Sequence, residues 1–210
     1  MRAVLFLLCL LISTPALQAA EKIATLILLS KSVQVIRDGR MLEVRSQETA
    51  LYNDDQLETS AAGKAKILFE NGDIGYLGPN STLDIHTEKT SMVTKVSLKL
   101  SGKLRSLVNH RARRSFRVRT VNAVIGVKGT DFITESSGDQ TRVGTLKGLV
   151  SLSSNLTGGT IDVPAGKQGA VNISGKIMPL TEIAGDILDG VEIGGRQLDL
   201  EESAGHKVSP

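Results

Sequence analysis

The chain has 210 residues, with 25 lysines and arginines against 22 aspartates and glutamates, and 40% of its residues are hydrophobic. This length predicts one ordinary globular domain, with at most a tail. A net charge of only +3 argues against a general nucleic-acid-binding protein, because neutralising many phosphates requires a large basic excess. All 21 glycines follow residue 37 and only 3% of the residues are aromatic, so we predict a turn-rich β-protein with an aliphatic core.

Residues 1–20 have the pattern of a secretory signal peptide. Arg2 supplies a positive charge, the apolar stretch Ala3 to Ile12 follows, and Pro15 precedes the small residues Ala19 and Ala20. This stretch is too short to span a membrane, which needs about 20 apolar residues. We therefore expect cleavage after Ala19 or Ala20. The product is expected to be periplasmic or secreted in a Gram-negative-type envelope and not membrane-spanning.

Short β-type runs alternate with turn residues over residues 21–182, which we expect to form one β domain. Asp38-Gly39 separates two such runs, and Asn71-Gly72 follows the alternating run 65–69, so both dipeptides predict hairpins. Further runs are expected at residues 23–29, 93–100, 103–108, 115–121, 131–135, 142–146, 149–153, 160–163 and 168–173, with a turn at Ser101-Gly102. About a dozen strands at this spacing indicate an all-β fold: an antiparallel sandwich, a jelly roll or a short β-solenoid.

The hydrophobic period changes only near the C-terminus. Ile183, Ile187, Leu188 and Val191 fall on one helical face, although glycines in this segment weaken a helix. We expect at most one short helix or a linker at residues 183–195, followed by a disordered tail at residues 196–210.

Particular motifs, in a fixed order, resemble those of the FecR domain family. In the first half these are DQLET (55–59), GKAKI (63–67), NGD (71–73) and GPNS (78–81). In the second half they are FRVRT (116–120), AVIGVKGTDF (123–132), VGTLKGLV (143–150) and PAGKQ (164–168). The resemblance extends from about residue 30 to about residue 180. It implies a periplasmic β-rich domain, best known from regulators that relay a signal from an outer-membrane receptor to a sigma factor.

The segment AVIGVKGTDF (123–132), which resembles the central signature of the family, is interpreted as structural. Gly126 and Gly129 are expected to occupy backbone-permissive positions, while Val124, Val127 and Phe132 are expected to fill the core. A phosphate-binding loop is the alternative, but no helix is predicted after this segment to complete it. The signature residues given this role are Gly126, Val127, Lys128, Gly129, Thr130 and Phe132, with Lys128 standing where the family more commonly has arginine.

Residues that carry out chemistry are sparse. His86, His110 and His206 lie far apart, and the single cysteine, Cys9, lies in the expected signal peptide, so no metal site is expected. No nucleophile, base and orienting group stand in a recognisable arrangement. We therefore expect neither an enzyme nor a cofactor.

The most prominent local charge feature of the sequence is the basic stretch between residues 103 and 119. It contains seven basic residues and no acidic one: Lys103, Arg105, Arg111, Arg113, Arg114, Arg117 and Arg119. The stretch is interpreted either as a solvated loop and strand face or as a patch that binds an anionic partner, because arginine forks bind carboxylate and phosphate. In the second interpretation Arg111, Arg113 and Arg114 lie in the loop, and Arg117 and Arg119 point outward from the following strand.

Three functions remain compatible with the sequence. The preferred one is a non-catalytic periplasmic binding or scaffold module for another envelope component. The alternatives are a signalling regulator that works with an outer-membrane receptor and a sigma/anti-sigma pair, and a binder of lipopolysaccharide or peptidoglycan through a basic face. The expected partner is thus an envelope protein or an anionic envelope polymer, and not a nucleic acid.

Overall fold

The computed structural model describes residues 20–30, 32–44, 46–90, 93–110 and 114–191, which form seventeen strands and one short 3-10 helix. Residues 1–19 of the expected signal peptide and the whole expected tail lie outside this part. The strands are β1 (Lys22–Leu28), β2 (Val33–Arg37), β3 (Arg40–Glu43), β4 (Glu48–Tyr52), β5 (Gln56–Thr59), β6 (Ala65–Phe69), β7 (Ile74–Leu77), β8 (Thr82–Lys89), β9 (Thr94–Leu107), β10 (Arg114–Arg119), β11 (Ala123–Val127), β12 (Asp131–Ser137), β13 (Gln140–Lys147), β14 (Leu149–Ser154), β15 (Thr160–Pro164), β16 (Lys167–Asn172) and β17 (Ile177–Glu182). The 3-10 helix η1 spans Gly185–Ile187.

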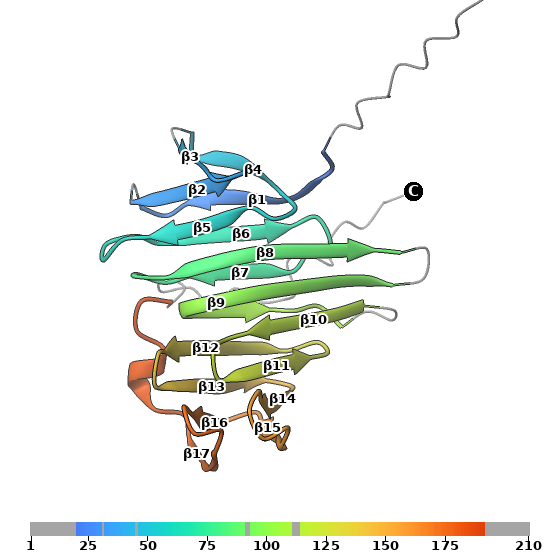
Figure 1. Ribbon diagram of the computed structural model, residues 1–210, viewed down its shortest axis with the longest axis vertical. Helices are drawn as coiled ribbons and strands as arrows, with labels where there is room; N and C mark the ends of the chain where they lie inside the picture. The colour runs from blue at the N-terminus through green and yellow to red at the C-terminus, as the bar shows by residue number, and fades with distance from the viewer. Residues whose placement is uncertain (1–19, 31, 45, 91–92, 111–113, 192–210) are drawn as a thin grey trace, which may run out of the picture.

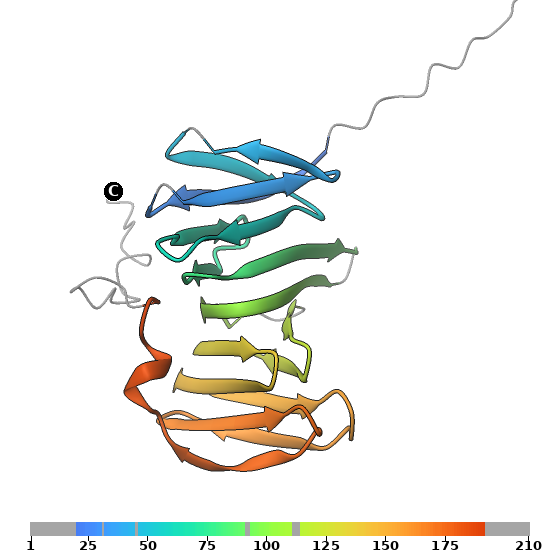
Figure 2. The same cartoon turned by 60° about the vertical axis from the view of Figure 1, so that its left-hand side comes forward.

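These strands form two sheets that share β9 (Figure 1). The first sheet has the order β4-β1-β6-β7-β9-β12-β13-β16-β17. The second has the order β3-β2-β5-β8-β9-β10-β11-β14-β15, in which β9 and β10 are parallel and the other neighbours antiparallel. The predicted all-β class is confirmed, and the two layers, seen in Figure 2, form a sandwich.

The core lies between the two sheets and is mainly aliphatic, as the composition predicts. Alternation places Ala65, Ile67 and Phe69 of β6 inside, where each is at most 3% exposed. Phe69, Phe116 and Phe132 are stacked edge to face along the core, with ring centroids 6.3 and 6.4 Å apart. Side chains at the intervening strand positions point out of the sandwich, where a site for a partner can form.

The predicted turn at Ser101-Gly102 is wrong, because β9 continues through it. The first part of β9 pairs with β8 and β10 in the second sheet, and the part from Gly102 onward pairs with β12 in the first sheet. Gly102 has a φ of 100°, which a residue with a side chain rarely adopts, so the strand changes direction there without a chain reversal. The glycine signal therefore marks the crossing from one sheet to the other.

Both predicted hairpins are confirmed, as β2–β3 and β6–β7. Asp38 and Gly39 both have positive φ, as the tightest hairpin turns require. At the second hairpin only Gly72 has positive φ, and the Asn71 side chain accepts a hydrogen bond from the Asp73 amide at 2.9 Å. The hydrophobic runs did not predict β4, β5, β8, β11 and β17. In β4 and β17 few residues are both apolar and buried.

The segment 183–191, called the strap below, leaves β17 and lies on the outer face of the first sheet (Figure 2). The expected helix there is reduced to η1, within the expectation of at most one short helix. Ile187 and Val191 are buried against Ile133, forming a small apolar cluster outside the main core. Within the residues described, no helix has the length and apolar character needed to cross a membrane.

Candidate functional site

The fold divides the basic stretch between opposite faces of the sandwich. Lys103 and Arg105 project from the second half of β9 on the outside of the first sheet, whereas Arg117 and Arg119 project from β10 on the outside of the second sheet. Arg114 is the first residue of β10 and not a loop residue. Arg111 and Arg113 lie outside the described residues. The seven residues therefore do not make one patch, because a strand that crosses between sheets presents its two halves to opposite sides.

The basic residues on the first sheet are already paired. Arg105 donates to both carboxylate oxygens of Asp131, at 3.0 and 2.7 Å, and Lys103 lies 3.3 Å from a carboxylate oxygen of Glu135. Both acids belong to β12, which neighbours this half of β9. The sequence stretch contains no acid, but the fold supplies one to each of these two bases.

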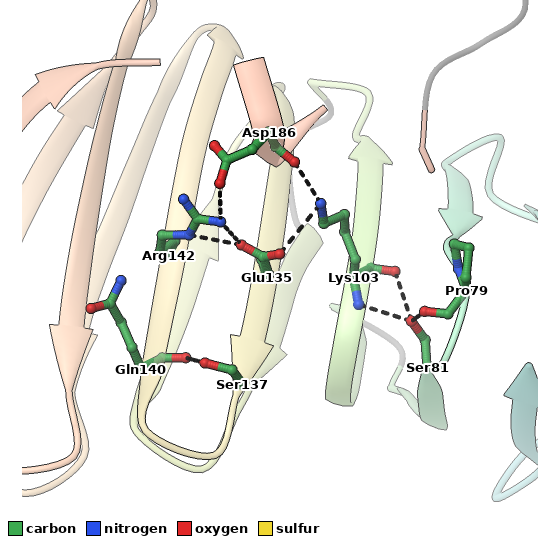
Figure 3. A network of polar contacts seen from close by, with 8 residues as sticks. All are labelled: Pro79, Ser81, Lys103, Glu135, Ser137, Gln140, Arg142 and Asp186. Atoms are coloured by element: carbon green, nitrogen blue, oxygen red, sulfur yellow. Dashed lines mark hydrogen bonds and ion pairs between the residues drawn. The ribbon is translucent and has the colours of Figure 1, made fainter. Parts of the chain in front are cut away.

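Glu135 belongs to a larger polar network that holds the strap (Figure 3). Arg142 of β13 forms ion pairs with Glu135 and with Asp186 of the strap, and the Lys103 ammonium donates to the Asp186 carbonyl at 2.8 Å. The hydrogen bond from Arg142 lowers the pKa of Asp186, and the same bond raises the pKa of Arg142. We therefore assign this side of the molecule a structural role.

On the second sheet the basic residues are exposed, and some of them have no acidic partner. Lys95 and Lys99 of β9 pair with Glu88 and Asp84 of β8, at 3.2 and 3.7 Å. Among the described residues, Arg117, Arg119 and Lys128 form no ion pair. Together, five exposed residues of this side form the basic face: Lys95, Lys99, Arg117, Arg119 and Lys128.

Beside Arg117 the basic face is hollowed into a groove of about 480 Å³, called the Gly126 groove. Pairing places Arg117, Gly126, Ser151 and Asp162 in one row across β10, β11, β14 and β15. A Cβ built on Gly126 would meet no atom within 4 Å, so the space above it is open. The groove thus has a floor of small residues, an arginine on one side and an aspartate on the other.

The structural predictions for the central signature, residues 123–132, are partly confirmed. Gly129 has a φ of 71°, and a Cβ there would lie 2.5 Å from the Cβ of His110, so its backbone-permissive role is confirmed. Gly126 does not have positive φ and faces outward, so that role is wrong for it. Val127 and Phe132 are buried as expected, but Val124 is half-buried on the outer face, because it alternates with the inward residues of β11. Lys128 is exposed and Thr130 is buried.

Histidines form no metal centre in the part of the chain that is described, and no group of three or more potential ligands gathers there. His86 instead lies 2.7 Å from Asp54 and 3.7 Å from Glu88. Its hydrogen bond to Asp54 is the main cause that raises the His86 pKa. His206 lies outside the described residues.

The residues that sequence reasoning missed are Gly126 as a groove floor and the lysines of β9. The strand alternation of β10 correctly predicted that Arg117 and Arg119 point outward. The parallel neighbour β9, which places Lys99 opposite Arg119, comes from a segment 20 positions earlier in the sequence. No pattern of neighbouring residues in the sequence predicts that β9 pairs with β10.

Fold and site together define an all-β sandwich module with an open, positively charged outer face. Residues 55–151 match the family described as FecR protein, which confirms over this part of the chain the resemblance seen in the motifs. This match begins just before β5 and ends in β14, so it includes β9, β10 and β11, which carry the basic face. No curated protein matches the chain.

Two crystal structures of a candidate anti-sigma factor from Parabacteroides distasonis ATCC 8503 are similar to this chain. Their TM-scores are 0.53 and 0.54, with 18% sequence identity, and each match covers 60% of this chain and 59% of the other. The similarity shows a shared fold. The chain spans somewhat less than two thirds of the length of these solved relatives.

Proposed function

We propose that this protein is a non-catalytic signalling regulator of the cell envelope that works by binding another envelope protein through the basic face. The observation that carries the proposal is the coincidence of a FecR domain with an outer sheet face on which Arg117 and Arg119 have no described acidic partner. The similar fold of a candidate anti-sigma factor supports a regulatory role. The expected signal peptide supports a periplasmic location.

A protein partner fits the basic face better than an envelope polymer does. Acidic residues interrupt the positive field, since Asp84 and Glu88 lie beside the lysines and Asp162 borders the groove. A polyphosphorylated surface would meet repulsion at each of these carboxylates, whereas a protein can match a pattern of both signs. The groove is also lined by no exposed aromatic ring that would stack on a sugar.

Site-specific photo-crosslinking in living cells tests the proposal. A photoreactive residue replacing Ser151, on the groove floor, is expected to form one discrete adduct with an envelope protein. The matched control is Leu68, which is exposed on β6 in the other sheet and is expected to give no such adduct. Arg117→Gln with Arg119→Gln should reduce the adduct from position 151. Equal adducts from both positions, or labelling of polymer alone, would reject a protein-binding basic face.

The regulatory part of the proposal needs a separate measurement. We expect that deletion of the gene and the Arg117→Gln, Arg119→Gln allele change the same set of transcripts, because both remove the same contact. Unchanged transcripts in both strains, with the crosslink from position 151 intact in the wild type, would mean that the protein is a scaffold and not a regulator.

The location is tested by osmotic shock. A mature protein that begins near Ala20 or Glu21 is expected in the released fraction. Recovery of the full-length precursor only after detergent extraction would contradict the periplasmic location.

A further inference from the structure

Arg117 and Arg119 have the spacing of side chains on one face of an extended peptide. They are alternate residues of β10, and both are exposed on the outer face. Alternate residues of a strand lie about 7 Å apart, so the side chains of Arg117 and Arg119 project from backbone positions at that separation. The same distance separates alternate side chains of any extended segment that runs along β10.

The surface beside the two arginines leaves room for such a segment. Next to Arg117 come Gly126 and Ser151, and next to Arg119 come Val124 and Ser153, in two parallel rows across β11 and β14. Gly126, Ser151 and Ser153 are small, and the space over Gly126 is open. A main chain can therefore lie close to the sheet along the groove, with its side chains directed toward its walls.

The charges on the two sides of the groove determine the direction in which acidic side chains of a bound segment would point. Arg117 and Lys128 line the groove on the β10 side, and Arg119 lies on β10 just beyond the groove. Asp162 stands on the β15 side, two strands beyond Gly126. Carboxylates on an extended segment would be attracted toward β10 and repelled from β15, which defines one orientation of the acidic face.

We propose that an extended acidic segment of the partner protein binds in the Gly126 groove and continues along β10, with carboxylates at alternate positions that pair with Arg117 in the groove and with Arg119 just beyond it. The inference rests on the proposed function, since it names the part of the partner that the basic face recognises. Each guanidinium presents a planar fork of donors that matches one carboxylate. Alternate spacing lets both pairs form without bending the segment.

Peptide binding to the purified full chain tests the register. Two labelled peptides of about ten residues are compared, identical in composition, with two glutamates either at alternate or at consecutive positions among serines and threonines. Alternate glutamates are expected to bind about fivefold more tightly in fluorescence anisotropy, because only they reach both arginines in an extended chain. Equal affinity of the two peptides would overturn the proposed register.

Three variants assign the binding to the groove. Arg117→Gln with Arg119→Gln should weaken the alternate peptide about tenfold and abolish the difference between the peptides. Gly126→Val should also weaken binding, since it fills the floor without changing the charge. Arg40→Gln with Lys64→Gln is the matched control for charge and should leave binding unchanged. Both residues are exposed, and β3 and β6, which hold or follow them, lie on the other side of β9 from the groove in the strand orders. Thermal melting establishes that each variant is folded.

Competition distinguishes a carboxylate site from a phosphate site. Inorganic phosphate or vesicles containing lipid A are not expected to displace the alternate peptide at matched charge concentration. Displacement would overturn the proposal in favour of an anionic polymer. If the peptides fail to bind while the crosslink from position 151 persists, the acidic segment is rejected and the proposed function stands. If both fail, both are rejected.

Discussion

Gly102 lies directly against Ser81, so closely that a Cβ at position 102 would be 2.3 Å from the Ser81 hydroxyl oxygen and 2.7 Å from its Cα. The same hydroxyl accepts a hydrogen bond from the Lys103 amide at 2.9 Å and donates one to the Pro79 carbonyl at 2.9 Å (Figure 3). The Gly-Pro-Asn-Ser element thus holds β9 where it passes from one sheet to the other. This crossing sends Lys103 to one face of the protein and Lys99 to the opposite face.

Gly102→Ala is expected to destabilise the protein by more than about 2 kcal/mol, because it combines an unfavourable φ with a clash against the Ser81 backbone. Gly138→Ala serves as the control, since a Cβ there meets no atom within 4 Å and φ is not positive. Urea unfolding of both variants checks the difference. Similar midpoints for the two would show that the crossing does not depend on glycine.

The two signature glycines are expected to differ in their tolerance of a side chain. Gly129→Ala should cost about 1–3 kcal/mol, because φ is 71° and the new Cβ would lie 2.5 Å from that of His110. Gly126→Ala should change the free energy of unfolding by less than about 1 kcal/mol, since the space at its Cβ position is open and its φ is not positive. Parallel thermal melts compare the variants, and a more damaging change at position 126 would contradict the outward placement of that residue.

Asp55 is expected to be far more sensitive to substitution than an exposed acid of the same region. It is fully buried, accepts hydrogen bonds from Arg37 at 2.7 Å on each carboxylate oxygen, and also accepts the Tyr52 amide at 2.8 Å. Asp55→Asn should lower the free energy of unfolding by about 2–4 kcal/mol, because it leaves a partly buried guanidinium without its charge partner. Glu70→Gln, which breaks the exposed pair with Lys22, should cost at most about 1 kcal/mol in the same denaturation assay.

The His86 ring is expected to titrate above the ordinary histidine pKa of about 6.5. The hydrogen bond to Asp54 is the main cause that raises the His86 pKa, and Glu88 adds to it. Because the folded-state pKa is raised, the stabilising contribution is complete below the unfolded-state pKa and disappears as pH rises through the folded-state pKa. The contribution is small, since the side chain is 48% exposed.

An NMR titration of the His86 ring measures this shift. Asp54→Asn should move the pKa back toward the ordinary value, and asparagine suits the positive φ of 66° at this position. Glu88→Gln is the control and should move it less, because Glu88 is the more distant partner. A pKa that does not respond to Asp54→Asn would refute the proposed origin of the shift.

Removing the apolar anchor of the strap should open it locally. Ile187 is fully buried and packs over Gly144, so Ile187→Ala is expected to cost about 2–4 kcal/mol. Hydrogen exchange at residues 185–191 should accelerate more than exchange in the core strands. Ile173→Ala removes the same atoms from a side chain that is 65% exposed and should leave exchange in the strap unchanged. Unaltered protection of the strap in Ile187→Ala would show that the polar network alone holds it.

The amino-acid sequence by itself determined the features that depend on near neighbours along the chain. Alternation assigned the inward and outward sides of β6 and β10, and the dipeptides Asp38-Gly39 and Asn71-Gly72 marked hairpins. These predictions succeeded because strand periodicity and turn conformation are properties of a few consecutive residues. The FecR motifs, taken in order, also predicted the family match that is found at residues 55–151.

Only the tertiary structure decided which charges meet. Arg105 is neutralised by Asp131, 26 positions later, whereas Arg117 has no acidic partner among the described residues and borders the Gly126 groove. In the sequence, the two arginines belong to one basic stretch. The fold separates them because β9 changes sheets at Gly102, and because strand pairing brings residues together according to their place in a sheet and not their distance along the chain.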